Sequence, residues 1–496
     1  MRDLLDAGLP AEGFVFDTAL AAYLLDATAG KYDLPRLFVS YFNQELPKPA
    51  HLEPEAFSPL GDRAAAWASL HSYGAAIEAL YGVLLPRLRE QGMEKLYFDV
   101  ELPLCRVLAD MERSGFLVDG GALARFGADL SDTIDRLEQR IYAAAGQQFN
   151  INSPKQLGKV LFEDLGLPHG KKTKTGWSTN ADVLEKLKNQ PLVADVLTYR
   201  QYAKLKSTYA DGLLKVIDPD GRIRTSFQMT VTATGRLSST EPNLQNIPTR
   251  TDLGSKMREM FVAAPGHVLV DADYSQIELR LLAHISGDTA MQQAFLSGAD
   301  FHTVTAARVF HVPQDQVTHQ MRSRAKAVNF GIVYGISAFS LSQDIGVTVQ
   351  EAKEYMDRYF ATYTGVKQYM TDVVDKAREQ GYVETLWHRR RALPELKSSN
   401  FNMRSFGERV ALNAPIQGTA ADIIKLAMIR VRDRLLRDGL KGRLVLQVHD
   451  ELIVECPEEE AEAVCALVKE EMEAVVSLPV SLLADTGSGK TWADAH

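Results

Sequence analysis

Two aspartates stand out because each closely follows a short apolar run. Asp273 comes after residues 267–270, and Asp450 comes after residues 444–448. Such runs predict β-strands, so two strand ends could present the carboxylates side by side. Paired carboxylates can hold two divalent ions that activate an attacking hydroxyl and neutralise a leaving oxygen, and an all-oxygen ligand set suits magnesium. The pair therefore indicates metal-assisted phosphoryl transfer, although strand-end aspartates in solvated turns would give the same pattern.

A third carboxylate, Asp271, competes with Asp273 for the role of metal ligand. Side chains two residues apart on a strand point to the same face, so both could reach one ion. The spacing alone leaves this choice open.

Between the two acidic segments, basic and aromatic residues recur at steps of four. Arg322, Lys326, Phe330 and Tyr334 would form one stripe about 18 Å long on an α-helix. Its cations could hold phosphates, and its rings could stack on a sugar or base. An ordinary amphipathic helix has a solvated basic side and separate buried rings. That alternative does not predict both kinds of residue on one stripe.

With these residues, the sequence resembles the family A DNA polymerases, and specifically the polymerising fragment of their bacterial members. The resemblance covers residues 94–496, and five motifs occur in the family's order. They are TGRLSSTEPNLQNIP at 234–248, DYSQIELR at 273–280, RxxxKxxNFGxxYG at 322–335, RVALNAPIQGTAAD at 409–422 and VHDE at 448–451. The resemblance implies template-directed DNA synthesis from dNTPs on a primer, with release of pyrophosphate, in DNA replication and repair.

The resemblance also assigns roles to the residues of the reaction centre. Asp273, rather than Asp271, and Asp450 would bind two Mg²⁺ ions, for which Mn²⁺ could substitute. Glu451 would lie close to the primer terminus. The residues implied to bind the incoming dNTP are Arg322, Lys326, His302, Phe330, Gln276, Glu278 and Tyr334.

Within that group, individual roles differ. Lys326 would neutralise charge on the pyrophosphate or protonate it. Phe330 would lie against the deoxyribose, and Tyr334 would stand where the templating base stacks. Glu278 would exclude ribonucleotides, because its carboxyl leaves no room for a 2′-hydroxyl.

A further set is implied to contact the primer-template duplex. It consists of Arg236, Asn243, Gln245, Arg409, Asn413, Gln417, His449, Lys172 and Lys174. Contacts in the minor groove, where correct pairs present acceptors at similar positions, test pair shape without reading sequence.

The implied fold is an α+β right-hand polymerase with a palm of antiparallel strands, helical fingers and a helical thumb. The predicted divisions are a truncated α/β exonuclease-like segment (1–93), thumb and connecting region (94–230), a first palm segment (231–290), fingers with the junction to the palm (291–429) and a second palm segment (430–496). Residues Ser69 and Tyr73 stand where that exonuclease carries a Tyr-x-x-x-Asp motif. Without its carboxylates it could not assemble metal ions, so we expect it to be inactive.

Charge and cysteine content agree with this assignment. The net charge of −9 argues weakly against nucleic-acid binding, but residues 386–409 carry six basic and two acidic side chains. Lys171, Lys172 and Lys174 form a second basic cluster, whereas residues 455–473 are acidic. We therefore expect the charges to be divided between a DNA cleft and an outer surface. Three cysteines without metal-binding spacing, no signal peptide and no long apolar stretch predict a cytoplasmic protein without membrane contact. The resemblance implies a bacterial, nucleoid-associated monomer.

Two other functions are compatible with parts of the pattern. Single-subunit RNA polymerases share a palm and an Arg/Lys helix, but Glu278 with Phe330 leaves no room for a 2′-hydroxyl. A catalytically dead DNA-binding protein would not need Asp273, Asp450, Arg322 and Lys326, all of which are present.

Overall fold

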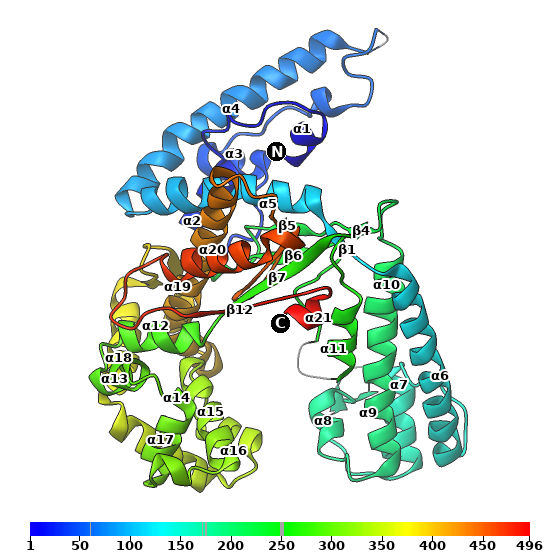
Figure 1. Ribbon diagram of the computed structural model, residues 1–496. Helices are drawn as coiled ribbons and strands as arrows, with labels where there is room; N and C mark the ends of the chain where they lie inside the picture. Colours follow the sequence, from blue (N-terminus) through cyan, green and yellow to red (C-terminus); the bar gives the residue numbers. More distant parts are fainter. Residues whose placement is uncertain (60, 171, 174–175, 249–251) are drawn as a thin grey trace.

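Helices surround a single four-stranded sheet in the computed structural model, which describes residues 1–59, 61–170, 172–173, 176–248 and 252–496. Two helical bodies extend downward from the sheet in Figure 1, one on each side, and a third lies above it. The bodies below are formed by residues of the predicted fingers and thumb. None of the helices among the described residues is long and apolar enough to cross a membrane.

The sheet is antiparallel and has the order β10–β11–β7–β12. Its strands are β7 (His267–Tyr274), β10 (Arg443–Val448), β11 (Glu451–Pro457) and β12 (Ala484–Gly489). All seven residues of β11 are buried, which agrees with its position inside the sheet. The strands predicted for the two separated palm segments are therefore confirmed. In this register, Asp273 on β7 lies opposite Glu451 on one side and Asp485 on the other.

Helices pack around the sheet and connect it to the predicted fingers. Long α19 (Phe401–Arg437), α20 (Ala461–Glu473), α12 (Ile277–Ile285) and α5 (Leu102–Ser114) contribute to the main apolar core together with the sheet. The further elements of the fingers side are α13 (Thr289–Leu296), α14 (Phe301–Phe310), α15 (His319–Val333), α16 (Ala338–Ile345), α17 (Val349–Thr362), α18 (Thr364–Gln380), β8 (Tyr382–Glu384) and β9 (Arg390–Ala392).

The predicted helix carrying the basic and aromatic stripe is α15. It begins after Thr318, whose side chain accepts a hydrogen bond from the backbone N–H of Met321. Arg322, Lys326 and Phe330 lie within the helix, and Tyr334 is its C-cap residue. The stripe is therefore confirmed as a helical surface, with its last member just beyond the helix.

The region predicted as the thumb is mostly helical, as expected. Its main pair is α6 (Gly120–Ala145) and α9 (Pro191–Lys204), which share an apolar core. Ser153 caps α7 (Pro154–Gly158), with Pro154 at the first turn as predicted. The short elements nearby are α8 (Ala181–Glu185), α10 (Asp211–Leu214), α11 (Asp252–Glu259), α21 (Trp492–Ala495), β1 (Phe116–Leu117), β2 (Lys172–Thr173), β3 (Gly176–Trp177) and β4 (Arg222–Ile223). The hairpin of β5 (Ser226–Gln228) and β6 (Ser238–Thr240) spans the predicted boundary at residue 230, so that boundary stays a prediction.

The α/β character predicted for residues 1–93 is wrong. The described part of this N-terminal helical segment consists of α1 (Arg2–Asp6), α2 (Thr18–Leu25), α3 (Leu34–Phe42), a short 3-10 helix (Ala50–Leu52) and α4 (Arg63–Glu90). Leu80, Leu84 and Leu88 recur at steps of four on α4 and pack against α2 in a separate apolar core. That spacing fits one face of a helix and not the alternation of a strand.

A buried ionic network connects the segment that precedes α5 to the fingers and to α19. The side chain of Glu101 contacts Lys425 at 2.7 Å and also contacts Arg389, which lies 2.7 Å from Asp422. Glu101, Asp422 and Lys425 are fully buried. Although burial alone would raise the pKa of Glu101, Lys425 and Arg389 lower it, so the carboxylate stays charged.

We expect Lys425→Met to reduce the free energy of unfolding by about 3–5 kcal/mol, because it leaves buried charges without a full set of partners. Denaturant unfolding followed by circular dichroism measures this. Lys188→Met, which removes an exposed pair with Glu185, is the matched control and should have little effect. Equal effects of the two substitutions would contradict the importance of the network.

Candidate active site

The two predicted metal ligands lie together at one end of the sheet. Asp273 is near the end of β7, and Asp450 lies in the tight turn between β10 and β11. His449 gives that turn its shape with a φ of 53°. The backbone N–H of Tyr274 donates to the carbonyl oxygen of Asp450 at 3.2 Å, which fixes the turn against β7.

The carboxylate pair carries an electrostatic cost. Burial, then the charges of Asp450 and Asp271, raise the pKa of Asp273 to about 7. Burial also raises the pKa of Asp450. Oδ1 of Asp273 is buried and has no hydrogen-bond partner among the described residues. An oxygen-rich, partly desolvated pair with an unsatisfied acceptor fits a hard divalent cation.

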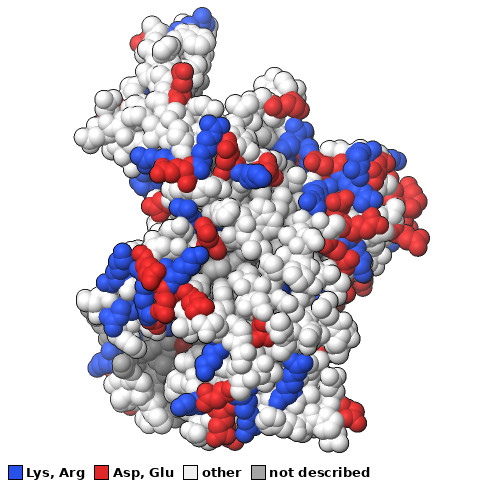
Figure 2. Space-filling view, turned by 90° about the vertical axis from the view of Figure 1, so that its left-hand side faces the viewer, with Lys and Arg blue, Asp and Glu red and all other residues white. Residues whose placement is uncertain are grey.

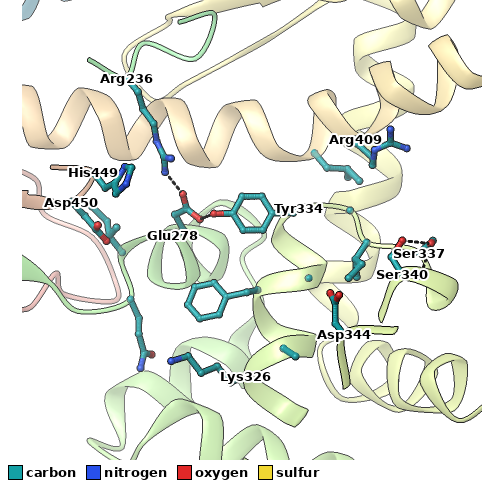
Figure 3. Close-up of a pocket in the computed structure, with 18 of the residues that line it drawn as sticks. Arg236, Glu278, Lys326, Tyr334, Ser337, Ser340, Asp344, Arg409, His449 and Asp450 are labelled. Carbon is teal, nitrogen blue, oxygen red and sulfur yellow. Dashed lines mark hydrogen bonds and ion pairs between the residues drawn. The ribbon is translucent and has the colours of Figure 1, made fainter. Parts of the chain in front are cut away.

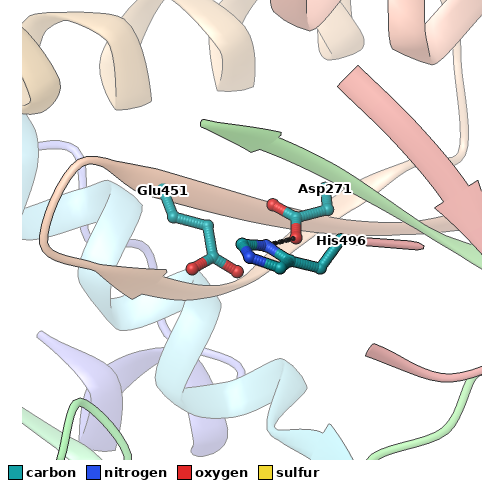
Figure 4. Close-up of side chains that lie close together, drawn as sticks. All are labelled: Asp271, Glu451 and His496. Carbon is teal, nitrogen blue, oxygen red and sulfur yellow. Dashed lines mark hydrogen bonds and ion pairs between the residues drawn. The ribbon is translucent and has the colours of Figure 1, made fainter. Parts of the chain in front are cut away.

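Asp271 faces a different set of partners, shown in Figure 4. Its Oδ2 lies 3.0 Å from Nδ1 of His496, and Glu451 accepts a hydrogen bond from Nε1 of Trp492 at 2.6 Å. Asp271, Glu451 and His496 offer ligand atoms within 4.8 Å of one another. His496 thus engages one oxygen of Asp271, whereas Oδ1 of Asp271, like that of Asp273, is buried without a hydrogen-bond partner among the described residues. The choice of Asp273 over Asp271 as the ligand stays a prediction. Burial, followed by the charge of Asp271, raises the pKa of Glu451 well above its ordinary value.

A cavity of about 1350 Å³ extends from the carboxylate pair toward α15 and α19 (Figure 3). It brings together many of the residues predicted for the reaction centre. The predicted residues that line it are Arg236, Asp273, Gln276, Glu278, Lys326, Phe330, Tyr334, Arg409, His449 and Asp450. Metal, nucleotide and primer residues predicted from separate motifs therefore share one space.

Glu278 is held from two sides inside this cavity. Its Oε1 accepts a hydrogen bond from Arg236 at 2.5 Å, and its Oε2 accepts one from the hydroxyl of Tyr334 at 2.8 Å. The side chain is buried, and burial followed by Glu278 raises the pKa of Tyr334 to about 12. The tyrosine hydroxyl is therefore a donor at neutral pH, and the carboxyl of Glu278 has a fixed position.

The start of α15 is tied to α14. Arg322 donates two hydrogen bonds to Asp300, at 2.9 and 3.0 Å, and does not line the cavity. His302 is buried, its Nδ1 lies 2.9 Å from Nδ2 of Asn329, and burial lowers its pKa to about 4. With the Asn329 amide donating to Nδ1, the neutral ring carries its proton on Nε2. Asp300 and Asn329 thus orient the two predicted phosphate-binding side chains. Asn329 belongs to the motif at 322–335 but was given no role, and Asp300 belongs to none of the five motifs.

The predicted DNA-contacting residues occupy three places. Arg409, Asn413 and Gln417 follow one another at helical steps of four on α19. Gln245 is buried and donates to Oε1 of Gln447 at 3.0 Å, and Gln447 donates to the carbonyl oxygen of His449 at 2.6 Å. Asn243 is exposed next to this chain of hydrogen bonds.

Lys172 lies 5.0 Å from the Trp177 ring and apart from the cavity, whereas Lys174 is outside the described residues. Gln447 was not predicted, and neither were Ser337, Ser340 and Asp344 of the cavity wall. Isolated polar residues near the ends of strands and helices have no distinctive spacing.

The expected division of charge is only partly present. In segment 386–409, Arg389 is buried in the ionic network and Arg391 pairs with Glu395 at 3.2 Å. Arg404 donates to backbone carbonyls of Ser398 and Ser399. On the face shown in Figure 2, basic and acidic side chains are interspersed over the described surface. Much of the basic excess in this segment therefore serves the fold.

The sheet with its carboxylate pair, flanked by two helical bodies, is the architecture of a right-hand polymerase. The model of DNA polymerase family A matches residues 121–494. The chain is 50% identical to DNA polymerase I of Geobacillus stearothermophilus and 48% identical to that of Bacillus subtilis (strain 168), over 98% of its own length. It spans 56% of the length of each of these two curated relatives.

A solved structure, the POL domain of Pol1 from M. smegmatis in complex with DNA primer-template and dNTP, has 43% sequence identity and a TM-score of 0.92. The match covers 99% of this chain and 84% of that one. The chain therefore belongs to DNA polymerase family A.

Asp273→Asn should raise the thermal midpoint more at pH 8 than at pH 5, measured without divalent ions. The folded protein holds the pKa of Asp273 at about 7, above its ordinary value of 3.8, so folding favours the protonated carboxyl. This contribution to stability is present at low pH and is lost as the pH rises through about 7. Asparagine removes the resulting repulsion at pH 8. Exposed Asp315→Asn is the control, and an equal change at both pH values would contradict the raised pKa.

Proposed function

We propose that this chain is a template-directed DNA polymerase that adds dNTPs to a primer 3′-hydroxyl and releases pyrophosphate. The observation that carries the proposal is the shared cavity, in which Asp273 and Asp450 face Lys326, Phe330 and Glu278. Membership of DNA polymerase family A supports it. So does the complex of the mycobacterial relative with primer-template and dNTP.

Asp273 and Asp450 are the residues that would hold two Mg²⁺ ions, with Mn²⁺ as a substitute. Two observations support this assignment: the buried Oδ1 of Asp273 has no hydrogen-bond partner among the described residues, and the charge of Asp450 raises the pKa of Asp273. When bound, the ions lower the pKa of the primer hydroxyl and neutralise charge on the leaving pyrophosphate. Glu451, one residue after Asp450, would lie next to the primer terminus.

The protein's own side chains would orient the nucleotide and supply a proton to the leaving pyrophosphate. Lys326, exposed to the cavity, would neutralise the triphosphate and donate a proton to the pyrophosphate as it leaves. Arg322 would bind phosphate while Asp300 keeps its guanidinium in place, and His302 would donate from Nε2. Phe330 and Gln276 would complete the nucleotide site, while Tyr334 would stack on the templating base.

Glu278 would act as the gate against ribonucleotides. Two hydrogen bonds fix its carboxyl, so it could not move aside cheaply for a 2′-hydroxyl. This rigidity favours a DNA polymerase over the related single-subunit RNA polymerases, and competition between dNTP and rNTP separates the two functions.

The duplex would lie along the stripe of Arg409, Asn413 and Gln417, with Arg236 and His449 at the primer end. Asn243, Gln245, Lys172 and Lys174 complete the proposed contacts with DNA. Because its relatives are bacterial DNA polymerases I, we propose a monomer that acts in replication and repair of the chromosome in the bacterial cytoplasm.

The first test is extension of a labelled primer on a DNA template with Mg²⁺ and four dNTPs. We expect the wild type to extend, Asp273→Asn and Asp450→Asn to lose nearly all activity, and Asp271→Asn to keep most of it. Circular dichroism checks that every variant folds. Equal losses in Asp271→Asn and Asp273→Asn would show that the ligand assignment is wrong, and no extension by folded wild type would leave DNA binding alone as the function.

The N-terminal helical segment is proposed to be inactive as a proofreading exonuclease. Ser69 and Tyr73 lie on α4, where Ser69 accepts or donates a hydrogen bond with His51 at 2.8 Å. Within the described part of residues 1–93 there is no group of His, Cys, Asp and Glu side chains at metal-ligand spacing.

We therefore expect no shortening of a 3′-mismatched primer with Mg²⁺ in the absence of nucleotides, as followed on a sequencing gel. A proofreading-proficient polymerase on the same primer is the positive control. Metal-dependent shortening that survives Asp450→Asn would overturn the proposal.

A further inference from the structure

We propose that the N-terminal helical segment sets the position of the nucleotide gate, through a relay of hydrogen bonds that begins at Tyr23. The relay runs from Tyr23 to Thr232, Arg236 and Glu278. This inference rests on the proposed polymerase function. It gives a segment without predicted chemistry of its own a role in nucleotide selection.

The first step connects the N-terminal helical segment to the palm. Tyr23 lies on α2, is fully buried, and donates its hydroxyl to the carbonyl oxygen of Thr232 at 2.8 Å. Burial raises the pKa of Tyr23, so the hydroxyl stays protonated and remains a donor. This hydrogen bond joins two residues 209 positions apart in the sequence.

The second step runs within the loop between β5 and β6. The hydroxyl of Thr232 donates to the backbone carbonyl of Arg236 at 2.6 Å, which closes the loop upon itself. Gly235 has a φ of +87°, and a Cβ at this position would lie 2.5 Å from Nε of Arg389. The loop is therefore held by Tyr23, packs closely against the buried Arg389, and has little freedom to shift.

The third step reaches the gate. Arg236 extends from the end of this loop and donates to Glu278 at 2.5 Å, while Tyr334 binds the other oxygen of the same carboxyl at 2.8 Å (Figure 3). A displacement of the loop would move Arg236, and the carboxyl of Glu278 would then lose one of its two fixed partners. Tyr23 is thus a positioning residue for Glu278, although it does not line the cavity.

The consequence concerns selectivity more than rate. Glu278 would exclude ribonucleotides by a steric clash between its carboxyl and the 2′-hydroxyl, and this clash is effective only if the carboxyl cannot move away. Loosening the relay should therefore raise the efficiency of rNTP incorporation relative to dNTP incorporation. The ratio of the two kcat/KM values is independent of the fraction of active enzyme, so partial loss of folded protein cannot change it.

The experiment is single-nucleotide extension of a primer-template with Mg²⁺ and either dATP or ATP opposite T, using the full chain. We expect Tyr23→Phe to lower the dATP/ATP ratio of kcat/KM by about two- to tenfold, the range for loss of one hydrogen bond. Thr232→Val removes the next donor and should lower the ratio similarly. The double variant should be little worse than either single variant, because both break the same relay.

Tyr32→Phe is the matched control. Tyr32 packs edge-on against Tyr23 with ring centroids 5.8 Å apart and donates its hydroxyl to the carbonyl of Asp26 at 2.6 Å, away from the relay. It should leave the ratio unchanged, whereas Glu278→Ala, the positive control, should lower it strongly.

Three outcomes would overturn the inference. An unchanged ratio in both Tyr23→Phe and Thr232→Val, while Glu278→Ala lowers it, would show that the relay does not position the gate. An equal loss in Tyr32→Phe would assign the effect to general loosening of the N-terminal helical segment. Absence of extension by wild type would overturn the proposed function itself, and this inference with it.

Discussion

Repulsion between buried carboxylates is the constraint on which the rest of this structure depends. Asp273 and Asp450 come from distant regions of the chain and would move apart if their backbones could do so. The antiparallel register of β7 with β11 and the hydrogen bond from Tyr274 to the Asp450 carbonyl prevent that. The apolar interior around β11 supplies the stabilisation that offsets the repulsion. The fold therefore holds two acidic side chains together, and their negative charge favours cation binding next to α15 and α19.

The side chains around the carboxylate pair are also held in fixed positions, in their case by hydrogen bonds. Asp300 orients Arg322, Asn329 orients His302, and Arg236 with Tyr334 orients Glu278. Each of these partners restricts the rotation of a side chain that is predicted to bind the nucleotide. Preorganised charges and donors lose little free energy in reorganising when a substrate binds, which is the usual source of large rate enhancements.

The sequence alone predicted those elements whose residues recur at a regular spacing. The steps of four from Arg322 to Tyr334 predicted α15 correctly, and the apolar runs before Asp273 and Asp450 predicted β7 and β10. The motifs also identified ten of the residues that line the cavity. Their roles and the domain boundaries stay predictions.

Other features could not be predicted because they depend on contacts between distant segments. His496 beside Asp271 and Gln447 beside Gln245 have no local pattern, and the arginines of segment 386–409 looked like a DNA-binding patch. Arg389 instead completes a buried network, since charge counts do not show which side chains find internal partners. The α/β character expected for residues 1–93 was wrong, because the described elements there are all helices and the steps of four among Leu80, Leu84 and Leu88 fit a helix and not a strand.

The position of β7 in the sheet has a consequence for synthesis on the ribosome. Both of its neighbours, β11 and β12, are encoded far downstream, after all the helices of the fingers. During translation β7 therefore emerges with two unpaired edges and an apolar sequence, the combination most prone to pairing with other chains. Until β11 and β12 appear, β7 lacks the two strands that pair with it in the finished sheet, so this segment is the part of the palm most exposed to pairing with other chains during synthesis.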